Sequence, residues 1–234
     1  MENLSNIGRI FYGIAIAAMG LLTIYYRDFP YMLIPPHHVL MNGLAYVSGI
    51  LLFGAGGCIV FEKKLMPISL LLGVVLLLIF FFYYIPYEWH SGEWENAAKE
   101  LALAGGAIVA AGHRKWIRSG TVLFAITIIS FGTDHFLYAK EAAGYIPSWI
   151  PGHLFWMYLT GSALLGSGMA IILKIKPRLA AALLGTMIFI WVVILHIPKA
   201  IGAPLAHNEG EVTSAFLALG YCGIAFMLAG KRMN

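Results

Sequence analysis

The sequence predicts an all-α integral membrane protein with eight transmembrane helices, arranged as two four-helix repeats of parallel topology. Three observations predict this fold: an apolar composition, a series of apolar runs of membrane-spanning length, and a similarity between the two halves. Hydrophobic residues make up 60% of the chain and charged residues 11%, and the mean hydropathy is +0.82. A water-soluble globule cannot be covered by so few polar residues, so this class is excluded.

The apolar runs each approach the roughly 20 residues needed to cross the hydrocarbon core. We predict helices at about 7–26, 38–61, 65–87, 97–113, 119–140, 152–174, 178–198 and 212–230. The first follows the short polar segment Met1–Asn6, which is not basic, so we expect no cleavable signal. The breaks between runs alternate between segments rich in aromatic residues and proline and segments rich in lysine and arginine. Prolines end helices and stiffen the turns that follow.

Charge is sorted between the two sets of loops, and this predicts the orientation. One set, with both termini, holds eleven of the fifteen basic residues: Arg9, Lys63, Lys64, Arg114, Lys115, Arg118, Lys174, Lys176, Arg178, Lys231 and Arg232. The other set holds nine of the eleven acids and seven of the eight histidines. The positive-inside bias makes the basic side, and therefore both termini, cytoplasmic. The pI near 9.0 thus reflects topology, and no nucleic-acid partner is expected.

Residues 1–116 and 117–234 resemble each other, which predicts two repeated units. A 116-residue offset pairs Ile34-Pro35-Pro36-His37 with Ile150-Pro151-Gly152-His153, and a 112-residue offset pairs Ile85-Pro86 with Ile197-Pro198 and Gly20 with Gly132. Each unit crosses an even number of times, so the two have parallel topology. The second unit carries more polar groups. We therefore expect 1–116 to be a degenerate scaffold and 117–234 to carry the polar site, the alternative being a cleft shared by both.

The polar residues of the second unit form the candidate site. Asp134 and His135 lie in the outer half of the run at 119–140, His153 begins the next run, His196 ends the run at 178–198, and Glu211 begins the last. An ionisable side chain inside a membrane helix costs several kcal/mol unless it is paired or hydrated, so such residues indicate function. We expect Asp134, His153 and His196 to be catalytic. The further candidates for ligand binding are His135, Tyr138, Trp156, Met157, Glu211 and His37.

Three interpretations of this cluster stay open. His135, His153 and His196 supply imidazoles for a metal ion or haem, with a carboxylate beside them. Alternatively, His153 and His196 exchange protons with the carbonyl of a quinone, while Asp134 acts as their charge partner. In the structural alternative, these side chains satisfy one another and the helix ends freed by proline. Cys58 and Cys222 are far apart and form no CxxC pair, so we expect them to serve packing.

Several motifs of the second unit resemble those of the DoxX-like membrane proteins of bacteria. The motifs are Asp134-His135-Phe136-Leu137-Tyr138-Ala139, Ile150-Pro151-Gly152-His153-Leu154-Phe155, Tyr158-Leu159-Thr160-Gly161 and Leu195-His196-Ile197-Pro198. The resemblance covers most of 119–230, with a fainter echo in 1–116 through His37 and Glu95. It implies a four-helix unit, here duplicated, in a bacterial inner membrane, and a link to quinone-dependent oxidoreductases. The unit is also similar to that of the emopamil-binding and sigma-2 receptor group, whose acidic pair within one helix this chain lacks in clear form.

Together these observations predict a redox-associated protein that binds a quinone-like or other small amphipathic molecule near the non-cytoplasmic interface. A quinone is the expected cofactor, with a metal ion or haem as the alternative. The expected partners are membrane lipid and a soluble or membrane-bound oxidoreductase. Two other functions remain open: a non-enzymatic module that binds or transports a lipid or small molecule, and an assembly subunit of an oxidoreductase complex.

Overall fold

A computed structural model describes residues 2–27, 42–91, 94–202 and 209–231, and this part of the chain is helical with no strand. The long helices are α1 (Glu2–Tyr26), α2 (Asn42–Val60), α3 (Leu65–Ile79), α5 (Glu95–Ala111), α6 (Ile117–Leu137), α8 (His153–Ile172), α9 (Pro177–Trp191) and α11 (Glu209–Gly230). Shorter elements are the π-helices η2 (Phe80–Tyr84) and η3 (Val192–His196), and the helices α4 (Ile85–Ser91), α7 (Ala139–Ala143) and α10 (Ile197–Gly202).

Seven helical stretches of the described chain are long and apolar enough to cross a membrane, which makes this a multi-pass membrane protein. They are Asn3–Tyr26, Gly43–Val60, Leu65–His90, Ile117–Leu137, His153–Ile172, Pro177–Gly202 and Gly210–Gly230. The run expected at 97–113 is α5, a helix of 17 residues with Glu95, Lys99 and Glu100 in its first two turns. Those charges and its shorter length set it apart from the seven. Thirteen of its residues are buried, so α5 is an internal helix.

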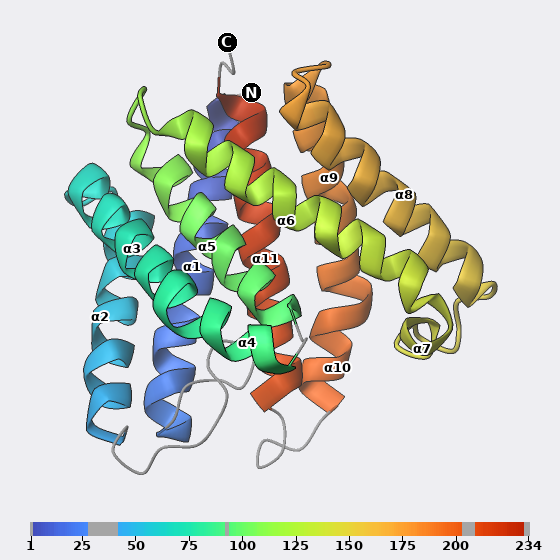
Figure 1. The fold of residues 1–234 in the computed structure, drawn as a ribbon, viewed down its shortest axis with the longest axis horizontal. Helices are drawn as coiled ribbons and strands as arrows, with labels where there is room; N and C mark the ends of the chain where they lie inside the picture. Colours follow the sequence, from blue (N-terminus) through green and yellow to red (C-terminus); the bar gives the residue numbers. More distant parts are fainter. Residues whose placement is uncertain (1, 28–41, 92–93, 203–208, 232–234) are drawn as a thin grey trace.

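The helices pack so that the first long helix of each half contacts the last long helix of the other half (Figure 1). α1 lies against α2 and α11, and α6 lies against α8 and α5. Within the halves, α3 packs on α5 and α9 packs on α11. The two internal helices, α5 and α11, also contact each other. The main apolar core lies around them and includes Tyr12, Phe124 and Ile224.

The two ends of the bundle differ in the residues that they carry. Both termini lie at one end (Figure 1), with the turns before α3, α6 and α9, and these turns expose Lys63, Lys64, Arg114, Lys115, Lys174 and Lys176. The short helices α4, α7 and α10 lie at the opposite end. His153 and His196 belong to this opposite end, because they mark the start of α8 and the last residue of η3. We call the two ends the basic end and the histidine end.

The third and seventh apolar runs share an unusual local structure. Each changes from α to π geometry just before an Ile-Pro pair, at Phe80–Tyr84 and at Val192–His196, 112 residues apart. Proline has no N–H to donate and its ring displaces the preceding carbonyl, and a wider turn accommodates both effects without breaking the helix. Each run also begins after a lysine with positive φ, Lys64 at 45° and Lys176 at 44°.

Glycines allow the close approach of neighbouring helices at equivalent places in the two halves. A methyl group added at Gly20 of α1 would lie 2.5 Å from the carbonyl oxygen of Gly49 in α2, and one added at Gly132 of α6 would lie 3.0 Å from that of Gly161 in α8. A side chain at either position would force the helices apart. Gly49 and Gly161 are also 112 residues apart.

Candidate functional site

The expected site residues of the second half fall into separate groups. Asp134 is half-buried near the end of α6 and interacts electrostatically with Glu95, His135 and Lys99. The side chain of His135 turns back on its own helix, where Nδ1 lies 2.7 Å from the carbonyl oxygen of Phe131. Asp134 is thus associated with the start of α5 in the first half. This differs from the expectation that Asp134 is the charge partner of His153 and His196.

A second group surrounds His196, the last residue of η3. The half-buried imidazole interacts electrostatically with Glu211 of α11 and Lys199 of α10. Lys199 Nζ lies 3.7 Å from Glu211 Oε1 and 4.1 Å from the centre of the Tyr145 ring. This arrangement joins η3, α10, α11 and the segment after α7, and it offers both hydrogen-bond donors and a carboxylate.

The candidates of α8 lie in a third environment. His153 is its first residue and is half-buried. Trp156 Nε1 donates a hydrogen bond to Pro151 O at 3.2 Å, and its ring meets the Trp191 ring edge to face at 6.3 Å. Met157 is buried in a small apolar cluster with Ala139, Ala143, Ile146 and Ile150, so it holds the α7 segment against the bundle.

The remaining candidates, Tyr138 and His37, and the three histidines of the metal hypothesis do not form a common site among the described residues. Tyr138 lies between α6 and α7 with 58% of its surface exposed, and His37 lies outside the described residues. Within the described ranges, no group of three or more His, Cys, Asp or Glu residues could hold a metal ion. His135, His153 and His196 therefore do not form such a group there, because they belong to the different environments described above.

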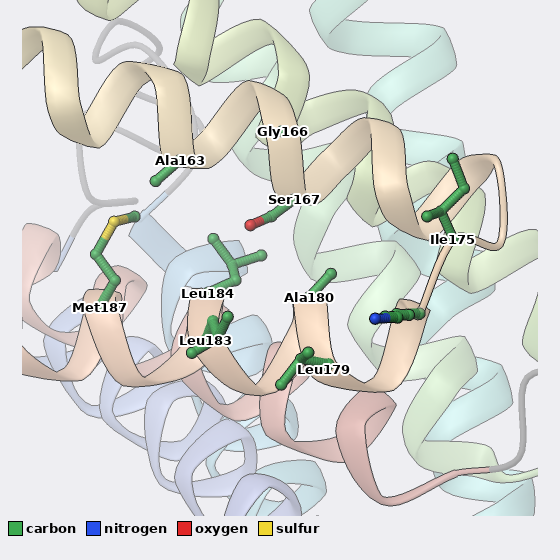
Figure 2. Close-up of a pocket in the computed structure, with 10 residues that line it drawn as sticks. Ala163, Gly166, Ser167, Ile175, Leu179, Ala180, Leu183, Leu184 and Met187 are labelled. Carbon is green, nitrogen blue, oxygen red and sulfur yellow. The ribbon is translucent and has the colours of Figure 1, made fainter.

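A groove between α8 and α9 has a volume of about 540 Å³ (Figure 2). Its lining is Ala163, Gly166, Ser167, Ile175, Lys176, Leu179, Ala180, Leu183, Leu184 and Met187. Ser167 and Leu184 extend into the space between the two helices (Figure 2). The groove runs toward the basic end, where Ile175 and Lys176 lie, and none of the predicted site residues lines it. It is apolar apart from Ser167 and Lys176.

The first half contains buried ionisable residues that sequence reasoning missed. Glu88, Lys99 and Glu100 are all buried. Both carboxylate oxygens of Glu88 accept from the Ala97 N–H, at 3.0 and 3.1 Å, so this side chain caps the start of α5. A negative charge there is stabilised by the helix dipole. Lys99 Nζ pairs with Glu95 Oε1 at 2.7 Å.

Glu100 lies among three buried tyrosines. Its carboxyl group interacts electrostatically with Tyr12 of α1, Tyr84 of η2 and Tyr221 of α11. The Tyr12 hydroxyl donates to Leu103 O at 2.7 Å, whereas those of Tyr84 and Tyr221 have no hydrogen-bond partner among the described residues. The sequence did carry a signal for this cluster, because Glu95, Lys99 and Glu100 interrupt an otherwise apolar run. The expectation that residues 1–116 serve as a scaffold left these three residues out of the candidate site.

Comparisons of the chain with models of protein families, with the curated proteins and with the solved structures find no match.

Proposed function

We propose that this protein binds a quinone-like or other small amphipathic molecule from the membrane, with the apolar tail between α8 and α9 and the polar head at the histidine end. The single observation that carries the proposal is the apolar groove of about 540 Å³ in the helix pair whose far end holds His153 and His196. Ligand sites of about 300–1,000 Å³ with mainly apolar walls and few polar groups are typical of small-molecule binding.

The path from groove to head group follows one stripe on each helix. On α9, Ala180, Leu184 and Met187 of the groove continue to Trp191, at spacings of three and four residues. On α8, Ser167 and Ala163 lie on the stripe that continues to Trp156. The Trp156 and Trp191 rings meet where the two stripes converge. A planar head group packs well against such rings, because they present large apolar faces.

Polar groups at the histidine end suit a carbonyl head. His196 and Lys199 supply N–H donors for a carbonyl oxygen, and Glu211 offers a charge partner for both. An imidazole exchanges a proton near neutral pH, which quinone reduction requires. His153 is a titratable residue of α8 at the same end, and Asp134 of α6 interacts with Glu95 and Lys99 at the start of α5. We propose on the same basis that the molecule is redox-associated, with an oxidoreductase as partner.

We further propose that the chain is a duplicated DoxX-like unit in a bacterial inner membrane, with both termini in the cytoplasm. The paired π-helices, the two lysines with positive φ and the two glycine contacts support the duplication, since each recurs 112 residues later. The exposed lysines of the basic end support a cytoplasmic position for that end. This arrangement puts the histidine end outside.

The test measures binding of a short-tailed ubiquinone analogue to the protein in lipid nanodiscs. Leu183→Trp fills the groove and should weaken binding about tenfold or more, a loss of about 1.4 kcal/mol. Leu71→Trp is the matched control, because Leu71 holds the equivalent place on α3 and is similarly exposed, 65% against 62% for Leu183. His196→Ala and His153→Ala should weaken binding and lower quinol formation in membranes. Equal affinity in all four variants and the parent protein would reject the proposal.

A second function, non-enzymatic binding of an anionic amphiphile, is favoured by Lys176. It is the one charged residue of the groove lining, and it lies at the basic end. In that case the head group would lie at Lys176, in the reverse orientation. Lys176→Gln should then weaken the binding of a fatty acid, while His196→Ala leaves it unchanged. The quinone proposal expects the opposite pattern for its own ligand.

A further inference from the structure

The interior of the bundle contains a carboxyl group without a basic partner. Glu100 is 3% exposed, and none of the ion pairs found in the described part of the chain includes it. The adjacent Lys99 is engaged by Glu95 Oε1 at 2.7 Å and Asn96 Oδ1 at 3.3 Å. An isolated carboxylate in an apolar interior is so costly that the group takes up a proton instead. The burial of Glu100 without a basic partner therefore favours its protonated form.

The groups that interact electrostatically with Glu100 are tyrosine hydroxyls. They belong to Tyr12 of α1, Tyr84 of η2 and Tyr221 of α11. Tyr84 also interacts electrostatically with Tyr221 and with the carboxylate of Glu88. α3 has no titratable residue between Leu65 and Ile79. Two of the three hydroxyls, those of Tyr84 and Tyr221, are buried without a partner among the described residues, so each is available to donate to or accept from the carboxyl group.

Electrostatic interactions also relate this cluster to an exposed acid. Tyr221 interacts with Glu95 as well as with Glu100. The Glu95 side chain is exposed and interacts with Asp134 at the histidine end. Glu95 is thus an exposed acid that interacts electrostatically with the buried Tyr221, which in turn interacts with the buried Glu100. Hydroxyl and carboxyl groups pass a proton when a hydrogen bond forms between them, and the buried Tyr221 hydroxyl has no other partner among the described residues to compete for such a bond.

We propose that Glu100, Tyr84 and Tyr221 form a reversible proton-binding site in the centre of the bundle, filled from the histidine end through Glu95 and Tyr221. The step is the transfer of a proton alone: the Glu100 carboxylate accepts H⁺ from water by way of Glu95, and returns it along the same route, with no change of oxidation state. This site lies in the first half and on α11, so it is separate from the proposed ligand site and does not depend on it.

Infrared spectroscopy of the full chain in lipid vesicles tests the proposal, with the proton and the deuteron as probes. At neutral pH the protein should show the C=O band of a protonated carboxylic acid, and Glu100→Gln should remove it. Glu88→Gln is the matched control, because Glu88 is also buried but caps a helix as a carboxylate; this variant should keep the band. Absence of the band from the unmodified protein, or its persistence in Glu100→Gln, overturns the proposal.

The rate of hydrogen–deuterium exchange at Glu100 tests the proposed route through Glu95 and Tyr221. After transfer to D₂O, the band should shift as the carboxyl group exchanges, and Glu95→Gln should slow this exchange at least about tenfold, a change within the usual contribution of a positioned proton-transfer group. Should Glu100→Gln fail to fold, Tyr84→Phe and Tyr221→Phe keep the carboxyl group and remove one hydroxyl each. Either change should move the band frequency, and an unchanged frequency in both variants overturns the assignment.

Discussion

At the scale of single residues, position in the bundle decides what an ionisable group does. Glu88 and Glu100 are both buried acids of the first half, yet one caps a helix and the other faces tyrosines. The sequence marks Asp134 and His196 as notable because they interrupt apolar runs, and this reasoning applies equally to Glu100. It cannot tell which residues meet, because Asp134 finds its partners on α5, a helix about 40 residues earlier in the chain.

Glu88→Gln should destabilise the protein by about 1 kcal/mol, because the amide keeps the shape of the side chain but loses the charge that faces the start of α5. The free energy of unfolding in a detergent titration measures the effect. Glu141→Gln on the exposed surface of α7 serves as the control and should be neutral. Equal stability of the two variants would contradict the capping role.

Lys231 should make stability depend on alkaline pH. It lies just beyond α11 and donates a hydrogen bond to Val109 O, and burial lowers the pKa of its ammonium group to about 8. The unfolded pKa is about 10.4, so between these values the unfolded chain binds the extra proton and stability rises with pH. Thermal midpoints measured from about pH 7 to about pH 10 should show this rise. Lys231→Met should flatten it, and an equal rise in the variant would refute the assignment.

At the scale of the helices, small residues and proline determine the geometry. The apolar runs and their breaks predicted the positions of the long helices well, because those features depend on local composition. The π-helices before Pro86 and Pro198 were not predicted. A proline can end a helix or only widen one of its turns, and the packing of neighbouring helices decides between the two. The short, charged α5 was expected to resemble the others, and its burial by its neighbours was not evident from its own sequence.

Glycine substitutions test the helix contacts. Gly20→Ala and Gly132→Ala should each lower the free energy of unfolding by about 1–3 kcal/mol, because the new methyl group meets the backbone of the next helix and, at Gly132, also the side chain of Leu165. Gly54→Ala is the matched control, since a methyl group added there has nothing within 4 Å. It should be neutral or slightly stabilising. A similar loss at Gly54 would show that helix contact is not the cause.

At the scale of the whole molecule, the described residues form eight long helices that place both termini at one end, and seven of the helical stretches in these residues have the length and hydropathy of a membrane span. The two halves are joined by the contacts of α1 with α11 and of α5 with α6. Sequence comparison of the halves predicted two units but not this exchange of contacts between them. Such contacts depend on tertiary packing, and the repeat pattern is the same whether the units sit side by side or interlock.

Cysteine labelling tests the topology. In a variant without Cys58 and Cys222, single cysteines at Lys63, Arg114 and Glu141 report on three of the segments between the long helices. A membrane-impermeant maleimide applied to intact cells should label Glu141→Cys, whereas Lys63→Cys and Arg114→Cys should react only after permeabilisation. Labelling of Arg114→Cys from outside would show that α5 does not cross the bilayer, and reversal of all three would show the inverse orientation.

Because α1 packs on α11, the first and last helices of the chain are neighbours in the bundle. The two chain ends and the turn at 112–116 lie at the same end of the molecule (Figure 1). Cutting that turn and tethering residue 234 to residue 1 should thus yield a circular permutant with the native shape. For the same reason, either half expressed alone exposes the apolar helix faces that normally pack on the other half. The two halves expressed as separate chains should therefore associate in the bilayer and form the complete bundle.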